Sequence, residues 1–115
     1  MALDPSNGTI EVQFNAKTEF TNPSGFIQGG FLAAMLDDTL GPAVFAMTKG
    51  KQVTTTIDLN VHYLRPVAVG QITTKAKVLS LGTNIAFVEG ELFNSAGKLS
   101  ARASSSAMLS EFATG

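Results

Sequence analysis

Apolar and polar residues alternate with a period of two in several segments, as they do in strands that have one buried face. The first is "TIEVQFN" (9–15), in which Ile10, Val12 and Phe14 share one side. Four more follow later in the chain, at 56–65, 72–81, 85–93 and 98–110. The turn residues "GTN" and "NSAG" separate the last three segments, so we expect consecutive antiparallel hairpins there.

The segment 56–65, "TIDLNVHYLR", shows this alternation most clearly. Strict alternation predicts one apolar face and one polar face. The apolar face would consist of Ile57, Leu59, Val61 and Tyr63. The polar face would consist of Thr56, Asp58, Asn60 and His62.

The pattern changes between Gly29 and about Ala46, where alanine, leucine and methionine dominate. This composition predicts the only long helix, which Pro42 either kinks or divides. Because its apolar residues cover more than one face, most of the helix surface must be covered. A curved antiparallel sheet wrapped around one long central helix achieves this, so we expect an α+β fold and a single domain over 1–115.

The composition points to an interface between copies of the chain. Of 115 residues, 44% are hydrophobic and only 15% are charged, whereas a charged share of roughly 25% is typical. A domain of this size has little interior to fill, so part of its apolar surface should be buried against another copy. The edges of a single sheet invite such pairing.

Charge and hydropathy argue against several classes of partner. The formal net charge is -1 and no run of lysine or arginine occurs, so we expect neither nucleic acid nor an anionic membrane as a partner. No window reaches the roughly 18 apolar residues of a membrane span. The N-terminal "MALDPSNG" lacks the apolar stretch of a signal peptide, and we therefore expect a cytoplasmic protein.

Cysteine and histidine, the usual soft metal ligands and reactive side chains, are almost absent from this sequence. Cysteine is absent and His62 is the only histidine, so we expect no metal site and no cofactor. The polar neighbours of His62 favour a solvated or interface position. Glu89 and Glu91 share one strand face, but exposed strand acids are commoner than a catalytic carboxylate pair.

Two adjacent carboxylates, Asp37 and Asp38, lie in the middle of the predicted helix. Aspartate usually caps or solvates a helix, but it is a poor helix former and neither residue has a lysine or arginine three or four positions away. Asp37 follows a stripe of small residues that includes Gly30 and Gly41, whereas Asp38 lies at the rim of the apolar side. A mid-helix acid without a local partner is a candidate for function.

The helix is expected to begin at the pair Gly29-Gly30. Such a pair is often only a flexible start to a helix, but a free backbone N–H at this end could also bind a carbonyl oxygen. Gly29 and Asp37 are two turns apart, roughly 12 Å along the axis, which is far for one helix to bind and attack one carbonyl. The gap closes if the acid comes from the antiparallel helix of a second copy.

At these residues the sequence resembles the hotdog-fold acyl-CoA thioesterases of the phenylacetate-pathway type. The matching positions are Asn22, Gly25, Gln28, Gly29, Gly30 and Asp37. Two later stretches, "TTTIDLNVHYLRPV" and "AFVEGELFNSAGKLSARASSSAML", resemble the strand of that family that ends in Tyr-Leu-Arg-Pro and its closing hairpin. The likeness extends from residue 9 to about 110.

The resemblance implies a role for each matching residue. The Gly29 N–H would polarise the thioester carbonyl, and Asp37 would act as nucleophile or as general base on water. Asn22 would orient the water or the carbonyl. A hydroxyl of Thr55 or Thr56 would help to position water, and Gln28 and Gly30 would contact the substrate. Phe26 flanks these residues and would either line the acyl pocket or pack the loop onto the helix. The two halves of each site would come from different subunits of a homodimer, which would further assemble as a dimer of dimers.

Gln28 is a departure, because the family has histidine at this position. Glutamine forms hydrogen bonds but does not titrate near neutral pH, so the activity could be weak or the substrate altered. The turn 82–84 also lacks a basic residue that many members have near the CoA phosphates. The cationic candidates that remain are Arg65, Lys98 and Arg102.

Three functions are therefore weighed. The preferred one is hydrolysis of an acyl- or aryl-CoA thioester to the free acid and CoA. The second, favoured by Gln28, is a non-catalytic hotdog module that binds acyl-CoA or serves oligomerisation. The third is a dehydratase acting on acyl thioesters, which would need a histidine–acid pair that this sequence does not place in the site.

Overall fold

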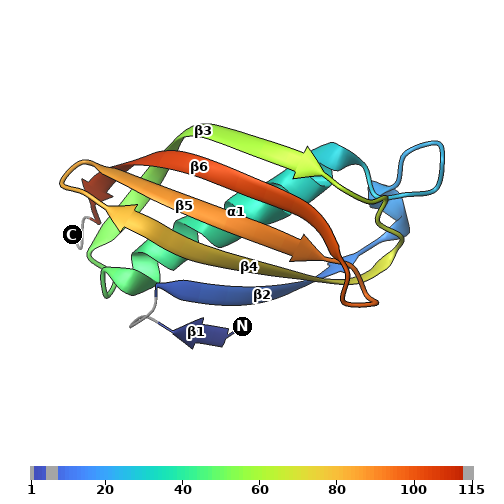
Figure 1. Cartoon of the computed structure of the whole chain (residues 1–115), viewed down its shortest axis with the longest axis horizontal. Helices are drawn as coiled ribbons and strands as arrows, with labels where there is room; N and C mark the ends of the chain where they lie inside the picture. The colour runs from blue at the N-terminus through green and yellow to red at the C-terminus, as the bar shows by residue number, and fades with distance from the viewer. Residues whose placement is uncertain (1, 5–7, 113–115) are drawn as a thin grey trace.

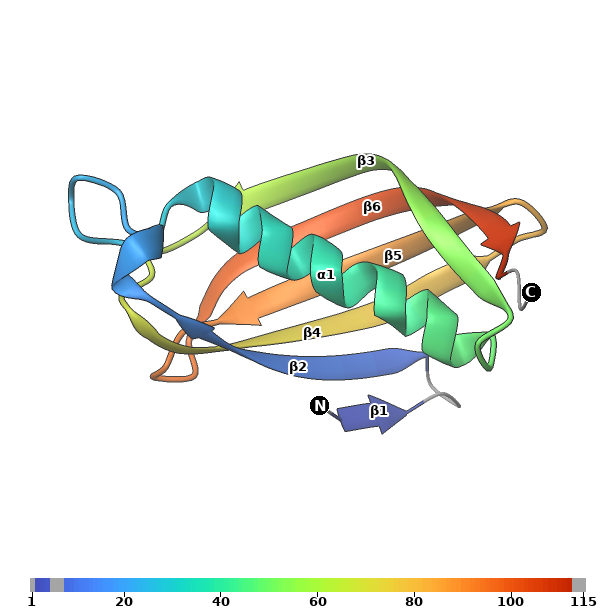
Figure 2. The same ribbon diagram turned by 180° about the vertical axis from the view of Figure 1, so that it is seen from behind.

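A long helix, α1 (Gly29–Met47), lies diagonally across one face of an antiparallel sheet (Figures 1 and 2). The computed structural model describes residues 2–4 and 8–112. The strands are β1 (Ala2–Asp4), β2 (Thr9–Ala16), β3 (Gln52–Tyr63), β4 (Gly70–Leu81), β5 (Ile85–Phe93) and β6 (Leu99–Glu111). Their order in the sheet is β1-β2-β4-β5-β6-β3. The predicted α+β architecture is confirmed.

The predicted elements are present, with two additional elements and two differences within the predicted ones. The short strand β1 pairs with β2 and was not predicted. A 3-10 helix, η1 (Thr18–Phe20), begins the loop before α1. β3 begins at Gln52 rather than Thr56, and α1 continues through Pro42 to Met47 as one helix.

The core forms between α1 and the concave face of the sheet. Seven helix residues are buried there: Leu32, Met35, Leu36, Thr39, Leu40, Ala43 and Val44. Gly90 of β5 allows this close approach, because a Cβ there would lie 3.0 Å from Leu40. The buried hydroxyls of Thr39 and Thr74 are 2.6 Å apart and hydrogen bonded to each other. This pair fixes the register of α1 on β4 without leaving a polar atom unpaired.

By length and composition, α1 also qualifies as a helix that could cross a membrane, so the expectation that no window would do so was too strict. The core helix of a soluble domain meets the same criteria. Here α1 contains Asp37 and Asp38, and its buried side chains pack on the sheet. We therefore assign it to the core.

The predicted alternation of β3 is wrong for Thr56 and Ile57, which precede Asp58. The register with β6 shifts between Thr56 and Asp58, so Thr56 pairs with Ala107 and Asp58 with Ser106. Ile57 is the extra residue of a β-bulge, which changes the phase of the alternation. Thr56 therefore lies on the concave face, on the same side as Leu59, whereas Ile57 is 53% exposed instead of buried.

β3 forms one edge of the sheet, and β1 forms the other (Figure 2). Among the described residues, β3 pairs only with β6, so its outer edge has free N–H and C=O groups. An edge of this length is a ready template for pairing with another strand.

Candidate functional site

The residues singled out from the sequence gather along the line where α1 packs beside β3, which we call the α1–β3 seam. The two elements run antiparallel along it. Three residue pairs define the seam: Gly29 with Tyr63, Asp37 with Thr56, and Gly41 with Thr54. Small residues on this helix face let β3 approach, since a Cβ on Gly41 would lie 3.1 Å from the Thr54 hydroxyl.

Asp37 is the acid of the seam. Its side chain is partly buried, and the Thr56 hydroxyl donates a hydrogen bond of 2.9 Å to its Oδ1. This bond holds the carboxylate in place and leaves Oδ2 without a donor among the described residues. Thr55 pairs with the exposed Met108 and so lies on the opposite face of β3. Of the two threonines proposed from the sequence, only Thr56 reaches Asp37.

Tyr63 holds the first turn of α1. Its hydroxyl donates a hydrogen bond of 2.8 Å to the Gly29 carbonyl oxygen. Its ring covers Gly29 so closely that a Cβ there would lie 3.1 Å from the ring. Because the Gly29 carbonyl belongs to the planar peptide that carries the Gly30 N–H, this bond orients that donor as well.

The backbone amides of Gly29 and Gly30 are the first two N–H groups of α1. Gln28 is the N-cap residue, and its exposed side chain makes no capping hydrogen bond. No acceptor for either glycine amide occurs within the described part of the chain. These N–H groups therefore face outward with the positive end of the helix dipole behind them, which suits a developing oxyanion.

The loop before α1 is organised by Asn22. Its Oδ1 accepts hydrogen bonds from the N–H groups of Ser24 (2.9 Å) and Phe26 (3.2 Å), and its own N–H donates to the Phe26 carbonyl (2.7 Å). Gly25 completes this tight turn with a φ of 86°. The side-chain oxygen of Asn22 is thus committed to the loop, and only its amide N–H groups can serve a ligand.

A cavity of about 440 Å³ lies between this loop, the start of α1 and the end of β3. The polar groups that line it include Asn22, the Gly29 backbone and Arg65. Apolar contributions come from Phe26, Leu32 and Leu64, among others. Phe31, nearby on α1, stacks on Phe20 with ring centroids 4.6 Å apart. The cavity joins backbone donors to an apolar wall, as a site for an acyl group requires.

The structure separates the three cationic candidates. Arg65 lines the cavity, and its Nε donates to the Leu99 carbonyl at 3.2 Å, which fixes the guanidinium at the rim. Arg102 pairs with His62 on the convex face. Lys98 lies in the exposed turn that precedes β6 and does not line this cavity. Of the three candidates, Arg65 is therefore the one that lines the same cavity as Gly29.

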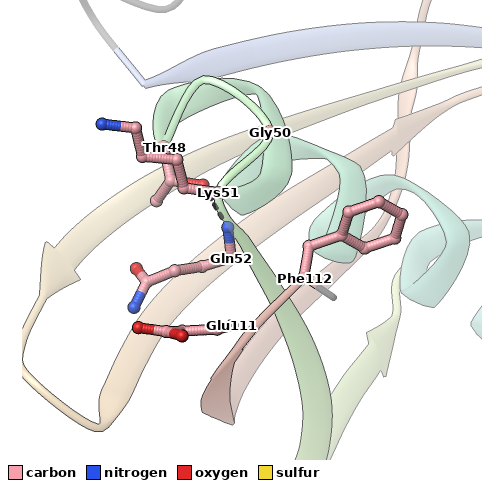
Figure 3. A pocket seen from close by; sticks show the side chains of 6 residues that line it. All are labelled: Thr48, Gly50, Lys51, Gln52, Glu111 and Phe112. Carbon is pink, nitrogen blue, oxygen red and sulfur yellow. Dashed lines mark hydrogen bonds between the residues drawn. The ribbon is translucent and has the colours of Figure 1, made fainter. Parts of the chain in front are cut away.

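A larger cavity, of about 590 Å³, lies at the other end of α1. Figure 3 shows the residues that line it, including Thr48, Lys51, Gln52 and Glu111. This end of the helix presents carbonyl groups and the negative end of its dipole, so it would repel an oxyanion. We therefore do not place the chemistry here despite the greater volume.

The remaining candidates lie away from the seam. His62 is exposed on the convex face of β3. Glu89 and Glu91 lie opposite Lys77 and Lys75 in the register of β4 and β5, an arrangement that stabilises the sheet. Within residues 2–4 and 8–112, no cluster of three or more histidine, cysteine or acidic side chains could hold a metal ion.

A single chain therefore holds two separate groups of predicted site residues. Asn22, Phe26 and Gly29 share the cavity, with the exposed Gln28 and Gly30 beside it. Asp37 and Thr56 form the other group and do not line that cavity.

Sequence reasoning missed Tyr63 as a member of the site. Its place at the end of the strand "NVHY", just before Leu-Arg-Pro, was visible, but nothing local indicated that its hydroxyl would reach Gly29. The contact spans 34 positions in the chain. Only the packing of β3 against α1 brings the two residues together.

Comparisons with known proteins identify the family and the fold of this chain. The thioesterase superfamily matches residues 24–101. Human acyl-coenzyme A thioesterase 13 is 31% identical over 97 residues, which are 83% of this chain and 69% of that protein. A phenylacetic acid degradation-related protein of Ralstonia eutropha JMP134 has a solved structure with a TM-score of 0.89 and 37% identity, covering 94% of this chain and 81% of its own.

A second solved structure, that of the BH2602 protein of Bacillus halodurans with CoA, shares the fold. Its TM-score is 0.80 at 24% identity, covering 85% of this chain and 69% of its own. The extent of the family match and the identity to its relatives are both high enough to assign membership. The chain belongs to the thioesterase superfamily and has the hotdog fold.

Proposed function

We propose that this protein hydrolyses an acyl- or aryl-CoA thioester at a site that two copies of the chain share. The carbonyl oxygen would bind the Gly29 N–H of one copy, and Asp37 of the other copy would drive the attack. One observation carries this proposal. The free amides of α1 and Asp37 lie on the same seam but roughly 12 Å apart along the helix, and only the amides adjoin the cavity.

The unpaired edge of β3 supports the sharing of the site. If β3 pairs antiparallel with its own copy about a two-fold axis, two sheets become one and the two helices run antiparallel on the same face. Each seam lies beside β3, so the acid of one copy then approaches the amide end of the other. The exposed side chains of Ile57, Tyr63 and Leu64, each more than half exposed, would be covered in such a dimer.

The chemistry follows from the groups that meet there. The N–H donors stabilise the negative charge that develops on the thioester oxygen. With Asp37 as general base, it takes a proton from water, the water oxygen bonds to the carbonyl carbon, and the C–S bond breaks to release CoA as its thiolate. With Asp37 as nucleophile, a carboxylate oxygen bonds to the carbonyl carbon and the C–S bond breaks, which releases CoA as its thiolate and leaves an enzyme-bound anhydride. Water then cleaves the anhydride to the free acid and the Asp37 carboxylate. Both routes need the carboxylate held in place, which Thr56 does.

The substrate class is supported by the cavity and by related proteins. The apolar wall suits an acyl or aryl group, and Arg65 at the rim suits the phosphates of CoA. The human relative is named an acyl-coenzyme A thioesterase, and the Bacillus halodurans neighbour was solved with CoA. Gln28 is exposed beside the amides, where it can hydrogen bond to the thioester but cannot transfer a proton.

Gln28 is also the observation that favours the second candidate, a hotdog module that binds acyl-CoA or its own copies without catalysis. A dehydratase is not supported, because His62 lies on the convex face of the sheet. A panel of acyl- and aryl-CoA thioesters, run together with analytical sedimentation, separates these functions. Binding of CoA analogues by a dimer that hydrolyses none of the panel would decide for the module.

Mixing two inactive variants tests whether the site is shared. Gly29→Pro removes the amide donor, and Asp37→Asn removes the acid. Random exchange of subunits makes half of the dimers mixed, and each mixed dimer contains one intact site, so about a quarter of wild-type activity should return. No recovery after verified subunit exchange would show that each site is built within one chain.

A further inference from the structure

The β-bulge in β3 lies next to the acid of the seam and is unusually well anchored. Its extra residue, Ile57, separates Thr56 from Asp58, and these two residues face opposite sides of the sheet. Thr56 faces α1 and holds Asp37, whereas Asp58 faces the convex side beside Ser106. Strict alternation would have put both side chains on one face.

Two serines of β6 hold Asp58 at three points. Its Oδ1 accepts hydrogen bonds from the Ser106 backbone N–H (2.8 Å) and the Ser106 hydroxyl (3.0 Å). Its carbonyl oxygen accepts a third from the hydroxyl of the buried Ser105 (2.7 Å). Bonds to an ionised carboxylate are stronger than bonds between neutral groups, so Asp58 is tied firmly to this register.

A register of β3 on β6 without the bulge would break the contact between Thr56 and Asp37. If β3 paired with β6 without the bulge, Ile57 would lie opposite Ala107 and turn toward α1. Thr56 would then lie opposite Met108 on the convex face and could not reach Asp37. Within a single chain this alternative is favoured by the burial of Ile57, which the bulge leaves 53% exposed until a second copy covers it. The bulge therefore needs a specific anchor.

We propose that Asp58 and Ser106 are positioning residues of the thioesterase site, which lock the β3 bulge so that Thr56 holds the Asp37 carboxylate. This inference rests on the proposed function for its kinetic consequences. Neither residue touches the reacting atoms, since both lie on the convex face of the sheet. They fix the register of β3 on β6. The register decides which β3 side chains face α1, and so it directs the Thr56 side chain toward Asp37.

Kinetics of four variants test this chain of action. Asp58→Ala should lower kcat about 10- to 100-fold with KM within about twofold, as loss of a hydrogen-bonded charge that acts only on the chemical step would. Asp58→Asn keeps an acceptor oxygen and should restore most of kcat. Ser106→Ala keeps the backbone bond and should have a smaller effect than Asp58→Ala. The matched control is Ser104→Ala, two positions away on the same exposed face, whose hydroxyl bonds to no described residue; it should match wild type.

A double-mutant cycle separates positioning from general damage. If Asp58 acts through Thr56, adding Asp58→Ala to Thr56→Ala should lower kcat no further than Thr56→Ala alone. If the fold reductions in kcat of the two single variants multiply in the double variant, the inference is wrong, because Asp58 then acts independently of Thr56.

Hydrogen exchange supplies a readout that does not need activity. The segment 52–58 should exchange faster in Asp58→Ala than in wild type, while Ser104→Ala should leave it unchanged. If the exchange rate of residues 52–58 is unchanged in Asp58→Ala, Asp58 does not hold the bulge in place, whatever the kinetics show. If wild type hydrolyses no thioester, the proposed function fails, and faster exchange in Asp58→Ala would still support the lock.

Discussion

The two ends of the α1–β3 seam that carry chemistry differ in what one chain supplies. At the amide end, Gly29 adjoins a cavity of about 440 Å³ that Asn22 and Arg65 also line. At the acid end, Asp37 is bound by Thr56 but has no share in that cavity. Among the described residues, the amide end has a cavity for a substrate but no base. The acid end has a base but does not adjoin that cavity.

This difference is the reason for proposing that one helix supplies both halves of a site that two copies share. A straight helix separates residues eight positions apart by roughly 12 Å, so the same carbonyl cannot touch both ends in one chain. A two-fold axis beside β3 would convert this separation into convergence, because it reverses the second helix. The unpaired edge of β3 lies where such an axis is needed.

The largest effect should come from removing the acid. Asp37→Asn keeps the size of the side chain but abolishes its action as base or nucleophile, so kcat should fall about 10²- to 10⁴-fold. The control is Asp38→Asn at the exposed neighbouring position, which should stay within about twofold. Steady-state kinetics on the best thioester provide the measurement, and unaltered turnover of Asp37→Asn would remove this residue from the mechanism.

The amide end is tested by comparing two substitutions at Gly29. Proline suits the first helical position, and the extended Gln28 before it (φ -64°, ψ 139°) is compatible with a following proline. Gly29→Pro removes the N–H, whereas Gly29→Ala adds the same Cβ against Tyr63 and keeps the donor. Proline should therefore lower kcat about 10²-fold further than alanine. Equal losses would indicate that crowding of Tyr63, rather than the donor, explains the effect.

Arg65 should affect binding of CoA rather than the chemical step. Arg65→Ala should raise KM for a CoA thioester about tenfold, because a charge-assisted contact to phosphate is lost, with little change in kcat. The same acyl group on a short thiol without phosphates should show no change in KM. Lys98→Ala is the matched control, since Lys98 does not line the cavity.

The smallest of these effects should come from Tyr63. Tyr63→Phe keeps the ring over Gly29 and removes one hydrogen bond of 2.8 Å, so kcat should fall about two- to tenfold. Ser104→Ala provides a contrast, because its exposed hydroxyl bonds to no described residue and its loss should leave kcat near wild type. A loss in Tyr63→Phe no larger than in Ser104→Ala would contradict the role of the tyrosine in orienting the first turn.

Much of this molecule could be predicted from local pattern. The strands at 9–15, 72–81, 85–93 and 98–110 follow from a period of 2, and the helix from Gly29 follows from its helix-favouring composition, both of which depend only on neighbouring residues. The same pattern marked Asp37 and Gly29 as unusual, because an unpartnered acid in a helix and a glycine pair at its start conflict with ordinary propensity. The resemblance to hotdog thioesterases was carried by the spacing of these residues.

Only the tertiary structure decided which way β3 faces and what it touches. The bulge at Ile57 shifts the alternation by one residue, and Asp58 beside it is hydrogen bonded to Ser105 and Ser106, nearly fifty positions later in the chain. That shift selects Thr56 over Thr55 as the partner of Asp37, and the same packing lays Tyr63 on Gly29. A period-two pattern records which residues alternate, but a change of phase is set by hydrogen bonds to the neighbouring strand, and these contacts leave no local trace.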